Sequence, residues 1–265
     1  MPERKDKVRY TLDPGLRGIN VGTTAICPVG EEDSVRLTYR GYPVDELAKK
    51  STFDEVSYLL VNGELPTKNQ LANWTSKIIQ NRILPEELQK ILDSLPITTH
   101  PMSVLRTAIS ALGAIFPEEN FDGKPEAIRI LGALPSIIGY WERRRCSHDK
   151  EVPFNSPEKS LAGYFLHTIT GVLPSPVHRR TLDCSLILYA EHELAASTYA
   201  TRVCASTLAD YYSCIISGIG TLSGPLNGGA NEAAIKLLQS FENSDDAEKS
   251  IRQMLKQREL IMGFG

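Results

Sequence analysis

Hydrophobic and polar residues follow two different periods along the chain. Between residues 18 and 42 the pattern is short and strand-like, with an apolar run over residues 21–26, a polar loop over residues 30–33 and alternating side chains over residues 35–39. This segment predicts one β-hairpin. From Pro43 onward the apolar positions recur at helical spacing, which predicts that almost all of the remaining chain is α-helical.

Capping residues and prolines mark where these helices begin and end. Thr52 and Glu55 have the spacing of a capping box, in which each side chain bonds the backbone amide of the other, and Gly63 is a typical stop. Thr67 and Gln70 repeat the box. The expected helices cover residues 53–61, 67 onward, 85–95, 100–113, 126–141, 157–170, 177–193 and 197–218. The sequence therefore predicts an all-α fold with one short N-terminal β-hairpin.

Two of these helices carry features beyond the apolar pattern. The helix over residues 126–141 is apolar on most faces, which places it near the middle of the fold, and Pro135 removes one backbone donor and can bend it. The arginine run at residues 143–145 is expected to interact with helix-terminal carbonyls rather than to form an anion site. The helix over residues 197–218 is rich in small side chains, so we expect it in a packed centre or a subunit interface.

Length and composition exclude several classes of protein. The 265 residues suffice to bury a core without disulfides or metals, and 42% hydrophobic and 23% charged residues are typical of a globular chain. A net charge of -3 gives no basic field for nucleic acid. No apolar run reaches the ~18 residues of a membrane span, and the charged first residues do not resemble a secretory signal. We expect a cytoplasmic protein with no nucleic-acid or membrane partner and no bound metal.

The cysteines do not suggest a disulfide framework or a zinc site. There are five, an odd number, and no two have the CxxC spacing. Cys184, Cys204 and Cys214 fall inside apolar helical patterns, where a thiol behaves as a small hydrophobe. We expect reduced, structural thiols.

Three segments contain residues that a core does not need. In the first, Glu191 and Glu193 flank His192 and could orient its imidazole and raise its basicity, as a carbonyl-binding histidine requires, although a purely structural histidine is the alternative. In the second, residues 224–232, two glycines let the backbone approach a ligand at a helix start, and a plain turn explains them equally well. The third is the glycine-rich stretch of Ile261, Met262, Gly263, Phe264 and Gly265.

Together with three further motifs, these segments resemble the ordered landmarks of the citrate synthase superfamily. The landmarks are Arg40-Gly41-Tyr42-Pro43, residues 63–67, His100-Pro101-Met102, Ala190-Glu191-His192-Glu193, residues 224–232 and Gly263-Phe264-Gly265. The match runs from about Gly18 to the last residue. Residues 22–30, residues 165–167 and the Gly-Gly-Ala-Asn-Glu form look most similar to bacterial 2-methylcitrate synthases, with ordinary bacterial citrate synthases as the alternative.

The resemblance implies a fold, a reaction and site residues. It implies a large helical domain over residues 1–230, the beginning of a small domain over residues 231–265, and a dimer. The implied reaction condenses propionyl-CoA or acetyl-CoA with the keto carbon of oxaloacetate and then hydrolyses the thioester, without a metal or a permanently bound cofactor. This reaction needs a base that removes the α-proton of the acyl group, a hydrogen-bond donor to the enol oxygen and a hydrogen-bond donor to the ketone oxygen. His192 matches the oxaloacetate-binding histidine, Asn227 stands at the position of a catalytic histidine, and residues 261–265 match the start of the CoA-binding loop.

The sequence also departs from the family pattern. An Asn227 amide can donate a hydrogen bond but cannot exchange a proton near neutral pH, and losing such a partner costs ~10²- to 10⁴-fold in rate. Ala196 replaces a usual asparagine, and the sequence stops at Gly265, one residue before the family's second catalytic histidine. We therefore expect little or no condensing activity from these residues alone. The alternatives are an inactive family member that pairs with or regulates an intact synthase, and a scaffold whose landmarks persist for packing.

Overall fold

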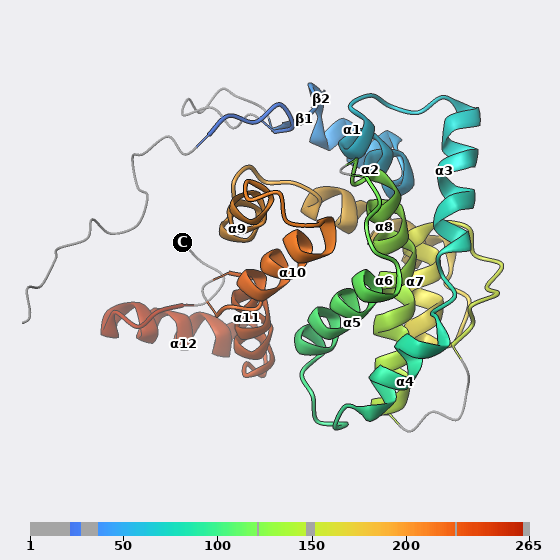
Figure 1. Ribbon diagram of the computed structural model, residues 1–265. Coiled ribbons are helices and arrows are strands. Elements are labelled where there is room, and N and C mark those ends of the chain that lie inside the picture. Colours follow the sequence, from blue (N-terminus) through green and yellow to red (C-terminus); the bar gives the residue numbers. More distant parts are fainter. Residues whose placement is uncertain (1–21, 28–36, 121, 147–151, 226, 262–265) are drawn as a thin grey trace, which may run out of the picture.

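The computed structural model describes residues 22–27, 37–120, 122–146, 152–225 and 227–261 (Figure 1). In chain order the elements are β1 (Thr38–Tyr39), β2 (Tyr42–Pro43), α1 (Val44–Lys50), α2 (Phe53–Asn62), α3 (Lys68–Gln80), α4 (Glu86–Ser94), α5 (Pro101–Ile115), α6 (Lys124–Arg145), α7 (Leu161–Thr170), α8 (Pro176–Tyr189), α9 (Ala196–Ala205), α10 (Tyr211–Leu222), α11 (Gly229–Gln239) and α12 (Ser244–Gln257). The all-α prediction is confirmed. Within the described ranges, no helix combines the length and hydropathy needed to cross a membrane.

The β-hairpin lies later in the chain than the sequence pattern predicted. Its two strands pair antiparallel, with Tyr39 opposite Tyr42. Arg40 and Gly41 form the connecting turn with φ angles of 50° and 87°, and positive φ at both turn positions matches the natural twist of a hairpin. The turn therefore requires the glycine.

The predicted first strand, residues 21–26, is wrong where the structure describes it, because residues 22–27 form an irregular segment. The carbonyl of Ile26 accepts a hydrogen bond from the backbone amide of Arg40 at 2.6 Å, and Cys27 is fully buried beside the hairpin. Burial, not strand pairing, thus accounts for this apolar run. The predicted loop, residues 30–33, and residues 35–36 of the second predicted strand lie outside the described residues.

Capping side chains set the helix starts as predicted. The Thr52 hydroxyl accepts from the amide of Glu55, and the Glu55 carboxylate accepts from the amide of Thr52 at 2.7 Å. Gly63 ends this helix, α2, with a φ of 95°. Thr67 and Gln70 make the same box at the start of α3. The predicted helices from residue 53 to residue 170 all agree with observed helices to within about one turn.

Two predicted helices in the second half are wrong in their extent. The helix expected over residues 177–193 ends at Tyr189, so the Glu191-His192-Glu193 trio lies after it. The helix expected over residues 197–218 is two helices, α9 and α10. Asp210 is the reason for the break, because its carboxylate accepts from the amide of Ser213 at 3.0 Å and starts a new helix.

Helix α6 lies at the centre of the bundle and runs through Pro135, as its apolar pattern predicts. Two glycines let neighbouring helices reach its backbone. A Cβ at Gly132 would lie 2.4 Å from the carbonyl oxygen of Ile78 at the end of α3, and one at Gly139 would lie 2.6 Å from the Cβ of Thr168 on α7. The largest core cluster joins α6 to α4, α5 and α10.

The arginine run that ends α6 binds helix-terminal carbonyls, as predicted, but those of other helices. Arg143 is buried and its Nε donates to the Thr168 carbonyl of α7 at 3.1 Å. Arg144 donates to the carbonyls of Asp93 and Leu95 at the end of α4, at 2.6 and 2.8 Å. These contacts tie the ends of three helices together.

A second core cluster holds the hairpin against α1, α2 and α8. Its buried members are Cys27, Tyr39, Val44, Leu47, Ala48, Val56, Leu59 and Ile187. Helices α11 and α12, at the lower left of Figure 1, have no fully buried residue in the described part of the chain. The division of the chain into two domains at residue 230 stays a prediction.

Candidate functional site

His192 lies in the connection between α8 and α9, residues 190–195, which we call the histidine loop. Its side chain is exposed. Glu191 is partly buried, and burial raises the pKa of its carboxyl while the electrostatic attraction of His192 opposes that rise. Ala196, where the family usually carries asparagine, is the first residue of α9, and no side chain caps this helix.

The buried Tyr39 side chain attaches the histidine loop to the hairpin. Its hydroxyl lies 3.0 Å from the carbonyl oxygens of both Ile187 and Glu191, and 3.3 Å from the amide nitrogen of Glu191, which donates to it. The carbonyl of Leu188 lies 3.4 Å away, and since a phenol has one proton to donate, the three carbonyls share it. Burial raises the pKa of Tyr39, so the hydroxyl stays protonated and keeps this donor.

Cys27 contacts the loop on the other side of His192. Its thiol is fully buried, and burial raises its pKa, whereas a hydrogen bond from the backbone amide of Glu193 works against that rise. Glu193 has a φ of 59°, in the left-handed region that residues other than glycine seldom adopt. The backbone on both sides of His192 is thus held by buried side chains from the N-terminal part of the chain.

Asn227 lies in a tight turn between α10 and α11. Its backbone amide donates to the carbonyl of Gly224 at 3.0 Å, and the amide of Gly229 donates to the same carbonyl at 3.2 Å. A Cβ at Gly228 would lie 2.7 Å from the carbonyl oxygen of Leu222, so the turn itself already requires this glycine. The Nδ2 atom of the Asn227 side chain is buried and has no hydrogen-bond partner in the described part of the chain.

The packing of α9 on α10 brings the two predicted site residues to the same end of the molecule. A Cβ at Gly218 of α10 would lie 2.4 Å from the Thr201 hydroxyl and 3.6 Å from the carbonyl of Ser197, so the start of α9 lies beside the end of α10. His192 precedes α9 and Asn227 follows α10. Within the described part of the chain, no hydrogen bond joins His192 directly to Asn227.

The His100-Pro101-Met102 motif meets the Glu232 end of the motif that contains Asn227. The Nε2 atom of His100 lies 3.6 Å from the Glu232 carboxylate, and Nδ1 of His100 accepts from the amide of Met102 at 3.2 Å. A ring nitrogen that accepts leaves the proton on the other one, so the protonated Nε2 is the nitrogen that faces Glu232. Lys236 also pairs with Glu232 at 2.7 Å and is the main cause of the lowered pKa of this carboxyl.

The predicted CoA-binding residues are described only at their start. Ile261 is buried, with 8% of its side chain exposed. Met262, Gly263, Phe264 and Gly265 lie outside the described residues.

Comparison with known proteins decides which family these motifs belong to. The profile described as "Citrate synthase, C-terminal domain" matches residues 15–265. The chain belongs to the citrate synthase family. The resemblance drawn from the six landmarks is therefore confirmed.

Relatives from the citrate synthase family match almost all of this chain. A 2-methylcitrate synthase of Shewanella oneidensis is 47% identical over 253 residues, which are 95% of this chain and 67% of that protein. A citrate synthase of Mycolicibacterium smegmatis is 42% identical over 261 residues, 96% of this chain and 68% of the relative. The chain thus spans about two thirds of the length of these relatives.

Solved structures of the citrate synthase family share the fold. The citrate synthase of Thermotoga maritima has a TM-score of 0.83 at 36% identity, covering 96% of this chain and 68% of that one. The citrate synthase of Thermoplasma acidophilum, solved as a ternary complex with carboxymethyl coenzyme A and oxaloacetate, has a TM-score of 0.87 at 28% identity, covering 97% and 68%.

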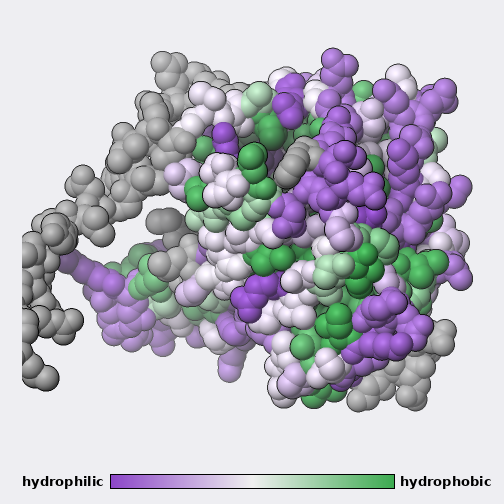
Figure 2. All heavy atoms as spheres, in the orientation of Figure 1, coloured by the Kyte–Doolittle hydropathy of each residue, from purple (hydrophilic) through white to green (hydrophobic). Residues whose placement is uncertain are grey.

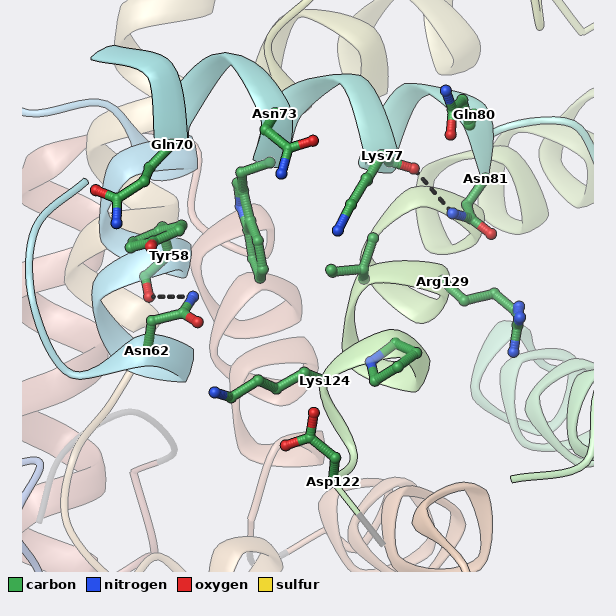
Figure 3. A pocket seen from close by; sticks show the side chains of 13 residues that line it. Tyr58, Asn62, Gln70, Asn73, Lys77, Gln80, Asn81, Asp122, Lys124 and Arg129 are labelled. Carbon is green, nitrogen blue, oxygen red and sulfur yellow. Dashed lines mark hydrogen bonds between the residues drawn. The ribbon is translucent and has the colours of Figure 1, made fainter. Parts of the chain in front are cut away.

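A cavity of about 490 Å³ opens elsewhere, between α2, α3 and the start of α6 (Figure 3). Lys77 and Lys124 line it with several amide side chains, and the buried Trp74 meets Tyr58 edge-on, with 5.4 Å between ring centroids. No histidine lines it, nor does any residue of the histidine loop or the Asn227 turn. Because this cavity contains none of the His192, Asn227 or His100 motifs, we place the candidate site at the family motifs and not in this cavity.

Sequence reasoning missed two residues of the candidate site, Tyr39 and Cys27. Tyr39 directly precedes the Arg40-Gly41-Tyr42-Pro43 motif, which is a local signal that it is special. Its contact with Glu191 spans 152 residues of sequence, and no local pattern reports such a contact. Cys27 was predicted only to be a reduced thiol.

Proposed function

We propose that the protein carrying this chain condenses an acyl-CoA with oxaloacetate, and that propionyl-CoA is its preferred acyl donor. The single observation that carries the proposal is the His192 motif, placed on a held loop at the same end of the molecule as Asn227. Family membership and the 47% identity to a 2-methylcitrate synthase support it.

The reaction balances as one carbon–carbon bond formed and one thioester bond broken. A base removes the α-proton of the acyl-CoA, the resulting enol carbon attacks the keto carbon of oxaloacetate, and water then releases CoA and 2-methylcitrate. In this proposal, His192 donates to the ketone oxygen and stabilises the negative charge that grows there. The base is not among the residues that we assign.

In this proposal, Asn227 is the hydrogen-bond donor to the enol oxygen. Its buried Nδ2 atom has no partner in the described ranges, and a buried donor left unpaired costs about 1–3 kcal/mol. The Nδ2 atom has no accessible surface, so the turn has to open before an enol or thioester oxygen of the substrate can accept from it and remove that cost. The amide cannot pass a proton, so we expect Asn227 to stabilise the enol and not to protonate it.

The proposed function is tested by CoA release from the complete gene product with propionyl-CoA or acetyl-CoA and oxaloacetate. We expect product formation that depends on oxaloacetate, with propionyl-CoA giving the higher kcat/KM, and a loss of ~10²-fold or more in His192→Ala. His178→Ala, on an exposed histidine at the start of α8, is the matched control. Full activity in His192→Ala would refute the proposal.

A second candidate function is pairing with another copy of this chain. A groove of about 440 Å³ between α4, α5 and α10 is lined by the small or apolar Ile91, Ala111, Ala114 and Ile216 and by the polar Arg106, Thr107 and Ser110. Figure 2 shows hydrophobic side chains gathered over the area where α5 lies in Figure 1. Small side chains allow helices of two subunits to approach closely. Light scattering of the 265-residue chain at micromolar concentration should give a dimer, and a stable monomer would contradict this role.

A further inference from the structure

We propose that Tyr39 and Cys27 are positioning residues that hold the backbone on both sides of His192. The expected effect on oxaloacetate binding rests on the proposed function. Tyr39 bonds the backbone of Glu191, the residue before His192, through both its amide and its carbonyl. Cys27 is fully buried in the cluster that contains Ile187 and Ala190, where the loop begins, and the Glu193 amide lowers the pKa of its thiol from the other side of His192. The loop has no regular secondary structure that would hold it otherwise.

The Tyr39 contacts also fix where α8 ends. The Ile187 carbonyl accepts from the amide of Ala190, which ends α8, at 3.3 Å, and the Tyr39 hydroxyl lies 3.0 Å from the same carbonyl and 3.4 Å from that of Leu188. Because the same hydroxyl reaches Glu191, the chain must turn away from the helix axis directly after Tyr189. The turn sets the direction in which His192 leaves the core.

The Cys27 contact holds a backbone conformation that is unfavourable by itself. Glu193 adopts a φ of 59°, and a residue other than glycine persists there only when its surroundings fix it. The buried Cys27, whose thiol pKa the Glu193 amide lowers, lies beside this residue and is one such restraint.

The N-terminal segment that supplies both side chains is itself anchored. The backbone amide of Arg40 donates to the carbonyl of Ile26, and the Arg40 guanidinium donates to the carbonyl of Leu60 at 3.3 Å. Tyr39 and Cys27 therefore act as one rigid support on which the loop rests. An imidazole must be held to within a fraction of an ångström and a few degrees to donate to a ketone, and such a support provides that.

Amide hydrogen exchange by NMR on the 265-residue chain tests the anchoring without any substrate. Tyr39→Phe removes only the hydroxyl, so we expect the Glu191 amide to exchange about tenfold faster while Glu193 stays protected. In Cys27→Ala we expect the reverse pattern, with the Glu193 amide exchanging faster. In both variants the His192 imidazole resonances should shift or broaden.

Tyr164→Phe is the matched control, because Tyr164 is another fully buried tyrosine whose hydroxyl lies 2.6 Å from that of Ser136, away from the histidine loop. It should leave the loop amides and the His192 resonances unchanged. A merely destabilising substitution would raise exchange of both loop amides together. Equal rises in both variants, or no rise in either, would overturn the inference.

A kinetic measurement on the complete gene product separates this inference from the proposed function. If His192 binds oxaloacetate, Tyr39→Phe should raise the KM for oxaloacetate about tenfold and leave the KM for the acyl-CoA within twofold. An unchanged KM for oxaloacetate would overturn the positioning role even if the exchange pattern holds. A wild-type protein without condensing activity would overturn the proposed function, and the exchange pattern would still decide the anchoring.

Discussion

Asp54 is predicted to make the protein less stable as the pH rises from 4 to 7. This carboxyl is 4% exposed, at the start of α2, and its Oδ2 atom accepts from the backbone amide of Leu161, the first residue of α7, at 3.2 Å. Its Oδ1 atom is buried and has no partner within the described ranges. Burial raises the pKa of Asp54 to about 6, and repulsion from Asp183 adds to the rise.

The direction of this pH dependence follows from whether the folded or the unfolded protein holds the proton of Asp54. Between the ordinary pKa of 3.8 and about 6, the folded protein keeps a proton on Asp54 that the unfolded chain releases. Stability from this group is therefore fully present below the lower value and is lost as the pH rises through the upper one. The gap between the two values corresponds to about 3 kcal/mol, an upper limit because the protein relaxes around the charge.

Asp54→Asn removes the titration and keeps an oxygen that can accept from Leu161. Urea unfolding followed by circular dichroism at pH 4, 5.5 and 7.5 should show the variant gaining up to about 3 kcal/mol on the wild type across this range. Asp122→Asn, at an exposed carboxyl, is the control and should show no such trend. If the difference between Asp54→Asn and wild type does not change with pH, or changes in the opposite direction, the reasoning is refuted.

Three further predictions concern packing and the site. Arg82→Met should lower the free energy of unfolding by about 3 kcal/mol. The reason is that this fully buried guanidinium donates at 2.5 and 2.7 Å to two carbonyls that precede α7. A change under 1 kcal/mol in urea unfolding would contradict this prediction. Gly132→Ala should destabilise the protein by about 2 kcal/mol, because the new Cβ would meet the carbonyl of Ile78. Gly220→Ala should be neutral or stabilise by up to about 1 kcal/mol, because a Cβ there would have no atom within 4 Å. Equal melting temperatures for the two variants would count against the packing argument. Asn227→His in the complete gene product should raise CoA release by ~10²-fold or more if proton transfer limits the rate, and equal activity would mean that the asparagine donor suffices.

Local patterns predicted the helices from residue 53 to residue 170 well. The capping boxes at Thr52 and Thr67 act within four residues, so the sequence contains all the information that sets α2 and α3. The same local logic, applied to Asp210, would have found the break between α9 and α10. It was overlooked because the small residues on either side continue the helical pattern.

The sequence predicted the motifs of the candidate site but not the buried side chains that hold the histidine loop. His192 and Asn227 were found because a family resemblance marks them, and helix patterns alone would have assigned His192 to the end of α8. The anchors Tyr39 and Cys27 act through contacts across 152 and 166 positions of the sequence, which depend on how α8 packs against the hairpin. The hairpin was misplaced because the buried segment around Cys27 has the same apolar pattern as a strand.

The contact between Tyr39 and the histidine loop also has a consequence for the order of folding. The hairpin is made early during synthesis, but the partners of Tyr39 emerge about 150 residues later. Closing so long a loop costs conformational entropy that must be recovered by packing α8 first, so the loop is expected to reach its final shape late. While the chain is being made, Tyr39 and Cys27 therefore stay without these partners until α8 and the histidine loop have emerged.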